Sequence, residues 1–157
     1  MTKQQAVVLV KPDGLQRGLV GEIITRFERK GLKLAAIKMT IMTDEMLDEW
    51  YIHHKEKPFF PKLKSAMQSS PVVAMLWEGL DCINAVRILT GTTLAREAEA
   101  GSIRGDLGMS QQLNLIHASD SPENAKKERD LIFDKEDVFT YQKDIELYIY
   151  SEEERGE

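Results

Sequence analysis

The 157-residue sequence contains a single cysteine, Cys82, so no disulfide can form within the chain. A lone thiol is typical of proteins kept in a reducing compartment, and we expect a cytoplasmic protein. Long apolar runs are also missing. The first such run, residues 6–10, is far shorter than the roughly 20 residues of a membrane helix, and it is too short for a signal peptide. We therefore expect no membrane association.

The sequence also lacks the short motifs of several enzyme classes. It has no Cys-x-x-Cys or His-Glu-x-x-His spacing, which argues against a structural or hydrolytic zinc site. It has no Gly-x-x-x-x-Gly-Lys-Ser/Thr, so any phosphate must be bound without a P-loop. Asp106-Leu107-Gly108 matches a protein-kinase tripeptide, but the glycine-rich and catalytic loops of protein kinases are absent, and we interpret the match as chance.

The charge balance is acidic, since 26 Asp and Glu against 21 Lys and Arg give a net charge of −5. Nucleic-acid binding depends on a basic surface that displaces counterions, so we expect no dedicated nucleic-acid binding. A local basic cleft within an acidic surface would suit a small phosphorylated substrate. With 42% hydrophobic residues, the chain has the composition of one globular domain with its own core.

Hydrophobic patterning predicts strands that alternate with helices. Residues 6–10 form a continuous apolar run, typical of a central strand covered on both faces. Gly31 is placed to end a helix, whereas Thr43, Asp81 and Ser121 are placed to begin one. The expected strands are 6–10, 32–42, 72–77 and 113–117. The expected helices are 20–30, 44–51, 62–68, 82–89 and one that opens at Pro122, with loops at 11–18 and 91–112.

This order of elements predicts an α+β fold. Two β-α-β halves match a ferredoxin-like α/β sandwich, in which helices cover a four-stranded antiparallel sheet. A doubly wound α/β fold is the alternative, but it suits four strands and unevenly spaced helices less well. The loop at 91–112 is long for a compact domain, and loops of this length are usually functional.

His117 is the strongest candidate for chemistry. It follows a short apolar run and precedes small polar residues in Asn114-Leu115-Ile116-His117-Ala118-Ser119-Asp120-Ser121. A histidine at the end of a buried strand, just before a helix, is oriented to use an unprotonated ring nitrogen. A lone histidine is more often packed or solvated than catalytic, so the surrounding residues decide between these interpretations.

Isolated cations would have to bind phosphates in the absence of a P-loop. Lys11, Arg87 and Arg104 each lie near the end of an apolar run, either as solvated surface charges or as phosphate ligands. Arg104 is the most informative because it lies between Gly101 and Gly105. A fork-shaped guanidinium in such a loop can bind phosphate oxygens in bidentate fashion.

Phe59 and Phe60 lie between two prolines, Pro58 and Pro61. A paired aromatic in such a loop usually plugs the core. The functional alternative is a ring at the rim of a cleft that stacks on a nucleobase, whichever base it is.

Five motifs, in order along the chain, resemble those of nucleoside diphosphate kinases. They are Lys11-Pro12-Asp13-Gly14, Tyr51 with Lys57-Pro58-Phe59-Phe60, Arg87 ahead of Gly91-Thr92-Thr93, Ser102-Ile103-Arg104-Gly105-Asp106, and Asn114 through Ser121. Each motif is weak alone, but five in this order make the match specific. The resemblance covers about residues 6–133. It implies a single domain of this kind over residues 1–157, with a C-terminal extension at about 139–157.

The resemblance also implies a role for each matching residue. His117 would be the nucleophile, phosphorylated on a ring nitrogen, with Ser119 in support and Tyr51 touching the catalytic site. Glu128 occupies the position of an acid that hydrogen-bonds the other ring nitrogen. It lies about two turns into the helix that opens at Pro122, so a contact back to His117 is geometrically reasonable.

The nucleotide-binding positions follow in the same way. Lys11, Arg87, Thr93 and Arg104 would bind the phosphates, Asn114 and Lys11 would reach the ribose, and Phe59 would stack on the base. The implied activity is transfer of the γ-phosphate of a nucleoside triphosphate to a nucleoside diphosphate by a ping-pong mechanism, with Mg²⁺ bound mainly through the nucleotide phosphates. Two alternatives are a non-catalytic nucleotide-binding regulatory or scaffold protein of the same fold and a phosphohistidine relay protein.

Three segments depart from the family pattern. Residues 94–100 lack the prolines usual there, Lys57 replaces an arginine, and Gln111-Gln112 replaces a more apolar run. The resemblance implies a homo-oligomer, most often a hexamer, with a tetramer as the alternative. Residues 94–100 are rich in helix formers, so we expect at least a helical turn there, with Glu97 and Glu99 facing solvent. Apolar side chains of the extension should pack on a neighbouring subunit: Tyr141, Ile145, Leu147, Ile149 and Tyr150.

Overall fold

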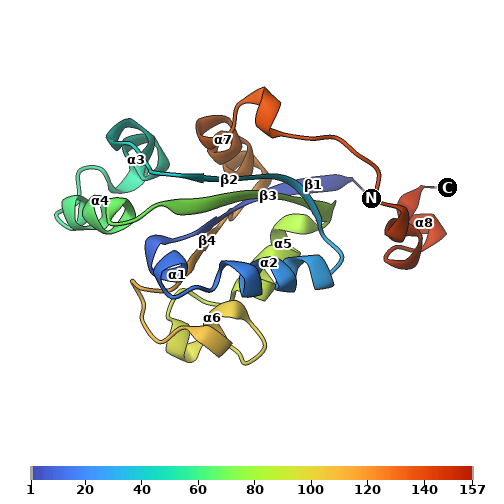
Figure 1. Ribbon diagram of the computed structural model, residues 1–157, viewed down its shortest axis with the longest axis horizontal. Helices are drawn as coiled ribbons and strands as arrows, with labels where there is room; N and C mark the ends of the chain where they lie inside the picture. The colour runs from blue at the N-terminus through green and yellow to red at the C-terminus, as the bar shows by residue number, and fades with distance from the viewer. Residues whose placement is uncertain (1, 157) are drawn as a thin grey trace.

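An antiparallel sheet runs through the middle of the structure, a computed structural model that describes residues 2–156 (Figure 1). Met1 and Glu157, the two ends of the predicted domain, lie outside the described residues. Within them the four strands pair in the order β2-β3-β1-β4, with every pair antiparallel. The strands are β1 (Lys3–Val10), β2 (Lys33–Thr40), β3 (Val72–Leu80) and β4 (Ile116–Ala118).

Helices fill most of the remaining chain. The α-helices are α1 (Pro12–Gln16), α2 (Val20–Arg29), α3 (Asp44–Trp50), α4 (Phe60–Gln68), α5 (Cys82–Thr90), α6 (Ile103–Leu107), α7 (Pro122–Ile132) and α8 (Glu152–Arg155). The short 3-10 helices are η1 (Ile52–His54), η2 (Ala95–Glu97), η3 (Lys135–Asp137) and η4 (Asp144–Tyr148). Among residues 2–156, none of these helices has the length and apolar character that a membrane-spanning helix needs.

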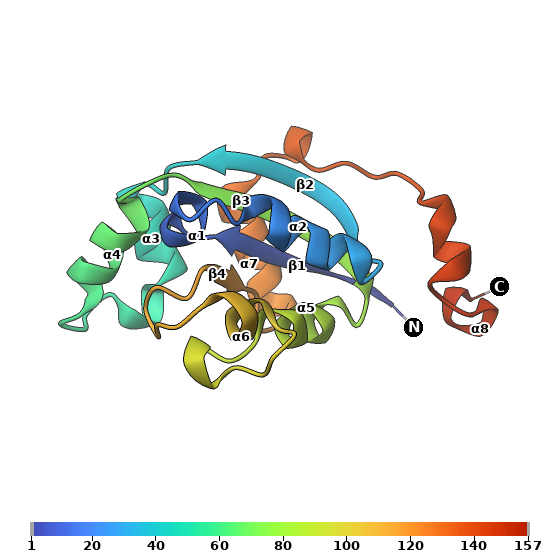
Figure 2. The same cartoon turned by 60° about the horizontal axis from the view of Figure 1, so that its bottom comes forward.

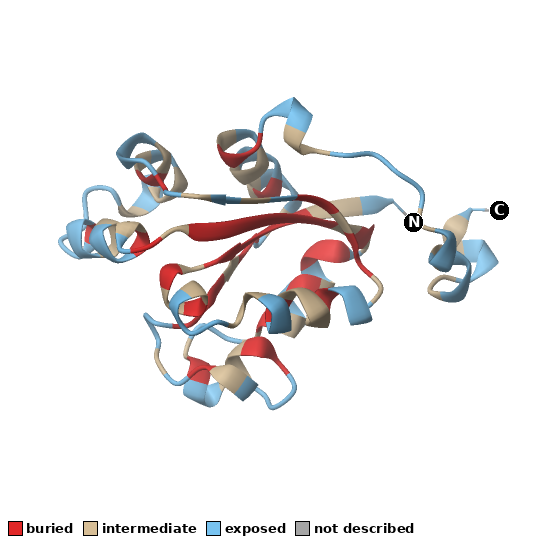
Figure 3. Ribbon diagram, viewed as in Figure 1, coloured by how far each residue is buried: buried red, intermediate tan, exposed pale blue. Residues whose placement is uncertain are grey.

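The sheet is covered on both faces. Helices α2 and α5 lie on one side and α3 and α7 on the other (Figures 1 and 2). Residues 6–10 of β1 are fully buried, and buried residues lie along the central strands and on parts of the helices that cover them (Figure 3). The predicted α+β sandwich with a four-stranded antiparallel sheet is confirmed. The doubly wound alternative is wrong because it requires parallel strands.

Local signals placed several helix ends correctly. The hydroxyl of Thr43 accepts a 3.1 Å hydrogen bond from the Met46 amide, and the Ser121 hydroxyl caps α7 through the Asn124 amide at 3.1 Å. Gly31 follows α2 with φ +98, a conformation that favours glycine. Asp81 precedes α5 but makes no side-chain cap bond. Its carboxylate accepts from the Asn84 side chain instead, and its own φ is +48.

Several predicted segments differ from the structure. Strand β1 begins at Lys3 rather than at residue 6, and β3 ends at Leu80 rather than at residue 77. The last strand begins at Ile116 rather than at residue 113, because Leu115 has φ +74 and cannot join the ladder. The loop at 91–112 holds η2 and α6, and of these only the helical turn within residues 94–100 was expected. The loop at 11–18 likewise contains α1. Helix η2 supplies the expected turn within residues 94–100, and Glu97 and Glu99 are exposed as predicted.

The C-terminal extension runs along the outer edge of β2. The Phe139 amide donates to the Ala35 carbonyl at 2.8 Å, and the Tyr141 hydroxyl donates to the Leu34 carbonyl at 2.7 Å. These bonds occupy acceptors on a strand edge that would otherwise be open. Tyr141 and Tyr150 therefore bind their own chain, the latter by accepting from the Leu80 amide at 3.2 Å.

Candidate active site

A cavity of about 500 Å³ lies where β4, α5 and α7 meet the end of α3 and η1. It collects side chains from positions far apart in the sequence. Eight of the ten predicted site residues line it: Lys11, Tyr51, Arg87, Thr93, Arg104, Asn114, His117 and Glu128. Ser119 and Phe59 do not line it. The sequence motifs therefore converge on one space, as a shared site requires.

Glu128 fixes one side of the His117 ring. Its carboxylate lies 2.6 Å from Nε2 of His117, and its other oxygen accepts a 2.5 Å bond from the Ser119 hydroxyl. Both side chains are largely shielded, His117 being 24% exposed and Glu128 13%. An ionised carboxylate accepts a proton, so this contact favours the tautomer with hydrogen on Nε2. Nδ1 of His117 is then the basic nitrogen, and within residues 2–156 it has no hydrogen-bond partner.

Ser119 contacts Glu128 on the side away from His117. It is fully buried, and its hydroxyl accepts a 2.9 Å bond from the Val7 amide in β1. The hydroxyl proton then remains for Glu128. Ser119 thus ties the orientation of the Glu128 carboxylate to the central strand of the sheet, which explains why it supports the site without lining the cavity.

Trp50 contacts His117 on another side, a contact that the sequence analysis did not predict. The two ring centroids are 5.1 Å apart with an interplanar angle of 69°, an edge-to-face arrangement. Trp50 is the last residue of α3 and lines the cavity. It was missed because it lies just outside the motif that begins at Tyr51, and no local signal directs its ring toward His117. With Glu128 it holds the imidazole in one orientation.

The start of β4 is built by the segment that follows β1. The amide of Lys11 donates to the Leu115 carbonyl at 2.8 Å, and the Leu115 amide donates to the Asp13 carboxylate at 2.9 Å. These two bonds hold the left-handed conformation of Leu115. A Cβ at Gly14 would lie 2.7 Å from the Leu115 oxygen, so only glycine allows this approach. The Pro-Asp-Gly motif therefore sets the position of His117, two residues further on.

Three cations share the opposite part of the cavity. Burial lowers the pKa of Arg104 to about 10, and the charge of Arg87 adds to this while Asp13 opposes it. Burial also lowers the pKa of Lys11, with Asp13 opposing the shift and Arg104 adding to it. The cations thus repel one another where little water can screen their charges. Asp13 is the acidic neighbour that acts on both Lys11 and Arg104. A bound anion would relieve this repulsion.

Arg104 is held in place by backbone acceptors. It donates to the carbonyls of Gly91 at 3.0 Å, Asn114 at 3.2 Å and Ile116 at 2.6 Å. A guanidinium has five N–H groups, so these three bonds leave two for a ligand. Arg87 extends from α5 and makes no hydrogen bond or ion pair within the described residues.

Asn114 positions the Lys11 ammonium, and its own amide groups are already hydrogen-bonded within the chain. Its amide donates to the carbonyls of Thr93 at 3.1 Å and Gln111 at 2.8 Å, which uses both amide protons. Its oxygen accepts from the Lys11 ammonium at 2.8 Å, and Lys11 also donates to the Gln112 carbonyl at 2.7 Å. One ammonium proton of Lys11 remains for a ligand.

Three aromatic side chains, Tyr51, Phe59 and Phe60, lie in or near the cavity. Burial, followed by the charge of Glu128, raises the pKa of Tyr51 to about 12, so its hydroxyl is a donor at neutral pH. Phe60 is buried at 6% exposure, whereas Phe59 is 48% exposed. The core-plug interpretation therefore holds for Phe60 alone. Phe59 lies outside the cavity lining, with its ring 5.4 Å from that of His54, which does line it.

The cavity provides few protein ligands for a divalent cation. Within residues 2–156 no group of three or more His, Cys, Asp or Glu side chains could hold a metal ion. Glu128 is already engaged by His117 and Ser119. The carboxylate of Asp120, also on the lining, accepts a 2.7 Å bond from Asn124 that lowers its pKa, so it is ionised. Mg²⁺ commonly takes one or two carboxylates together with substrate phosphates and water, and these residues fit an ion held in that way.

Comparison with known proteins agrees with this geometry. A family model described as "Nucleoside diphosphate kinase" matches residues 4–138. A nucleoside diphosphate kinase of Parabacteroides distasonis is 50% identical over 151 residues, which are 96% of this chain and 99% of that relative. The chain belongs to the nucleoside diphosphate kinase family. The resemblance inferred from the five motifs is confirmed, and the chain is a phosphotransferase that acts on nucleotides.

Other members of the nucleoside diphosphate kinase family extend the match. The enzyme of Archaeoglobus fulgidus is 48% identical, with 95% of this chain and 99% of that relative covered. A solved structure described as a halophilic nucleoside diphosphate kinase from Halobacterium salinarum in complex with CDP has a TM-score of 0.92 and 42% identity. That match covers 96% of this chain and 100% of the other. The family's fold thus extends over nearly the whole of this chain.

Proposed function

We propose that this chain moves the γ-phosphate of a nucleoside triphosphate onto a nucleoside diphosphate in two steps, through a phosphate carried on Nδ1 of His117. One observation carries the proposal. The 2.6 Å contact between Nε2 and Glu128 leaves Nδ1 as the basic nitrogen of a histidine that lines the same cavity as Lys11, Arg87 and Arg104.

The chemistry balances with the groups present. In the first step the Nδ1 lone pair forms a bond to the γ-phosphorus while the bond to the β–γ bridging oxygen breaks, and the nucleoside diphosphate leaves. The imidazole gains positive charge, which the Glu128 carboxylate stabilises through the Nε2 proton. In the second step a terminal oxygen of another nucleoside diphosphate takes the phosphate from Nδ1, and the neutral ring returns. One site serving donor and acceptor in turn gives ping-pong kinetics.

The cations would provide most of the rate acceleration. Phosphoryl transfer needs positioning and charge neutralisation more than covalent assistance from the protein. The two remaining N–H groups of Arg104, the remaining proton of Lys11 and the unpaired Arg87 are suited to bind phosphate oxygens, with the Thr93 hydroxyl beside them. A magnesium ion, bound mainly through the phosphates, would neutralise part of their charge. Asn114 and Lys11 would face the ribose.

Phe59 would provide a platform for the base. Its half-exposed ring beside His54 supports a place at the rim, where the base stacks and the phosphates point inward. Stacking does not depend on base identity, so we expect broad tolerance among nucleotides. We also propose a homo-oligomer, a hexamer first and a tetramer otherwise, and a cytoplasmic location.

The test is a labelling experiment with a chase. The purified chain is incubated with ATP labelled on the γ-phosphate, quenched, and examined for protein-bound label. We expect label that is acid-labile and alkali-stable, that maps to the peptide containing His117, and that moves to unlabelled GDP. His117→Ala should take no label, while calorimetry shows that it still binds ADP. A chain that takes no label, or label that GDP fails to remove, would contradict the proposal, the second result indicating a phosphohistidine relay.

A further inference from the structure

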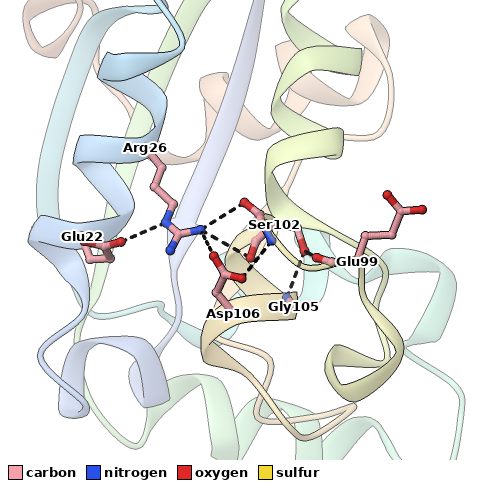
Figure 4. Close-up of polar contacts among 7 residues, drawn as sticks. Glu22, Arg26, Glu99, Ser102, Gly105 and Asp106 are labelled. Atoms are coloured by element: carbon pink, nitrogen blue, oxygen red, sulfur yellow. Dashed lines mark hydrogen bonds and ion pairs between the residues drawn. The ribbon is translucent and has the colours of Figure 1, made fainter.

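Arg26, on α2 and outside the cavity lining, is the centre of a polar cluster away from the active site (Figure 4). Its guanidinium binds the Asp106 carboxylate at 2.6 Å and the Glu22 carboxylate at 3.0 Å. It also donates to the carbonyl of Gly101 at 3.1 Å. Arg26 therefore connects α2, which packs on the sheet, to both ends of the short helix α6.

Helix α6 needs such a connection. It has five residues, too few for a helix to be stable by its own hydrogen bonds. The Ser102 hydroxyl closes the turn before it, donating to the Glu99 carbonyl at 2.6 Å and accepting from the Gly105 amide at 2.9 Å. A Cβ on Gly105 would overlap the Glu99 oxygen, so this turn is tightly packed. The turn is locally well defined, yet none of these bonds attaches it to the sheet.

The same helix carries a residue of the active site. Arg104 and Asp106 are two positions apart, which at about 100° per residue places them on opposite sides of α6. Asp106 faces α2 and Arg26, whereas Arg104 faces the cavity and the carbonyls of Gly91 and Ile116. The contact between Arg26 and Asp106 therefore also helps to fix the direction in which Arg104 points.

A second contact holds α6 at one end only, its last turn. Arg17 donates to the Leu107 carbonyl at 2.6 Å, which holds the C-terminal end of α6. Without Arg26, the N-terminal end would keep its internal turn but lose its attachment to α2. Buried Ile103 and the three backbone bonds of Arg104 would keep α6 on the cavity side. Loss of Arg26 would therefore allow a small shift of α6, and with it of the Arg104 guanidinium, rather than its release.

We propose that Arg26 is a positioning residue for nucleotide binding, which holds α6 through Asp106 and Gly101 so that the Arg104 guanidinium faces the phosphates. This inference rests on the proposed phosphate role of Arg104. An exposed ion pair usually adds little to folding stability. A phosphate clamp, in contrast, depends on geometry within a fraction of an ångström. The effect of Arg26 should therefore be larger on binding than on stability.

The experiment is a double-mutant cycle read out by ADP binding. In the Arg26→Met variant we expect the calorimetric Kd for ADP to rise by about three- to thirtyfold, the range of coupling seen within one polar network. In an Arg104→Ala background the same change should have less than a twofold effect, because no guanidinium remains to be positioned. Asp106→Asn, which keeps the shape of the side chain, should reproduce the Arg26→Met result if the latter folds poorly.

Two controls separate positioning from general damage. Glu22→Gln removes the contact of Arg26 within α2 and touches no part of α6, so it should leave the Kd for ADP unchanged. Arg26→Lys keeps one ion pair without the fork and should give an intermediate Kd. A full penalty of Arg26→Met in the Arg104→Ala background, or an unchanged Kd in the otherwise native chain, would overturn the inference. Because the experiment measures ADP binding, its result does not depend on whether His117 is phosphorylated.

Discussion

The Glu128 carboxylate bridges Nε2 of His117 at 2.6 Å and the Ser119 hydroxyl at 2.5 Å, so one side chain connects the candidate nucleophile to the centre of the sheet. This arrangement has a chemical consequence for the ring. The nitrogen that faces Glu128 carries the proton, and the positive charge that would develop in the proposed phosphorylation would lie beside a carboxylate. Geometry and electrostatics therefore favour reaction at the same atom, Nδ1.

Replacing Glu128 by glutamine should slow the chemical step without weakening nucleotide binding. Glu128→Gln keeps the shape but removes a charge-assisted hydrogen bond worth about 1.5–3 kcal/mol, which corresponds to roughly a ten- to hundredfold loss in kcat. The ADP Kd should stay within twofold, since Glu128 contacts His117 rather than the cations. Glu123→Gln, on the exposed surface of the same helix, is the matched control. An unchanged kcat in Glu128→Gln would show that the contact is structural.

Trp50 should act on kcat in the same direction but less strongly. An edge-to-face pair of rings contributes about 0.5–1.5 kcal/mol beyond the burial of its area. Trp50→Leu removes that contact with His117 and should reduce kcat by about two- to tenfold, whereas Trp50→Phe should retain most of it. Single-turnover labelling of His117 measures the effect directly. Equal rates in the leucine and native chains would mean that Glu128 orients the ring alone.

Part of this site could be predicted from the sequence, for identifiable reasons. Continuous apolar runs and capping residues depend on neighbouring positions, so β1 and the starts of α3 and α7 were correct. The five motifs are also local, and the cavity brings seven of their predicted residues together. Glu128 was placed through the resemblance and helical spacing, and its contact with His117 is present in the structure.

The rest depends on contacts between distant segments. Leu115 has a positive φ because Asp13, about a hundred residues earlier, accepts its amide hydrogen, and no local signal indicates this. Trp50 reaches His117 only through the packing of α3 against the sheet. In the sequence, Arg26 and Glu22, four residues before it, look like an ordinary ion pair within a helix. The contact of Arg26 with Asp106 spans 80 residues and has no local signal.

Lys11 should make ADP binding sensitive to alkaline pH. Burial, opposed by Asp13 and reinforced by Arg104, lowers the Lys11 pKa below its ordinary value of 10.5. A bound phosphate favours the charged ammonium and raises that pKa again. Affinity should therefore be constant below the lowered pKa of the free protein and fall as the pH rises through it. The Kd for ADP, measured by calorimetry from neutral pH to about pH 10, follows this change.

The Lys11→Arg variant is the control for that pH profile. The ordinary pKa of arginine lies well above that of lysine, so the Kd of this variant should change less with pH than that of the native chain. A profile that is equally steep in both proteins would assign the pH dependence to another group.

The C-terminal extension should stabilise its own chain first. Lys3 binds Glu146 at 2.7 Å, Tyr141 donates to Leu34 at 2.7 Å, and the Leu80 amide donates to Tyr150 at 3.2 Å. Truncation after Val138 removes these bonds and exposes the edge of β2. The melting temperature in a thermal scan should fall by several degrees. For a chain of this size, each kcal/mol of lost stability lowers it by about 2–4 °C. An unchanged melting temperature would show that these contacts contribute nothing to folding.

Two apolar side chains of the extension test the proposed assembly separately. Ile145 is 52% exposed and Leu147 59% exposed, so neither is explained by packing within the described chain. If they pack on a neighbouring subunit, the double variant Ile145→Ser and Leu147→Ser should lower the oligomeric state in sizing chromatography at micromolar concentration. The bonds of Tyr141 and Tyr150 to their own chain remain in that variant, so the dissociated chain should stay folded by circular dichroism. An oligomer of unchanged size would place the subunit interface elsewhere, and the extension would then serve only the edge of β2.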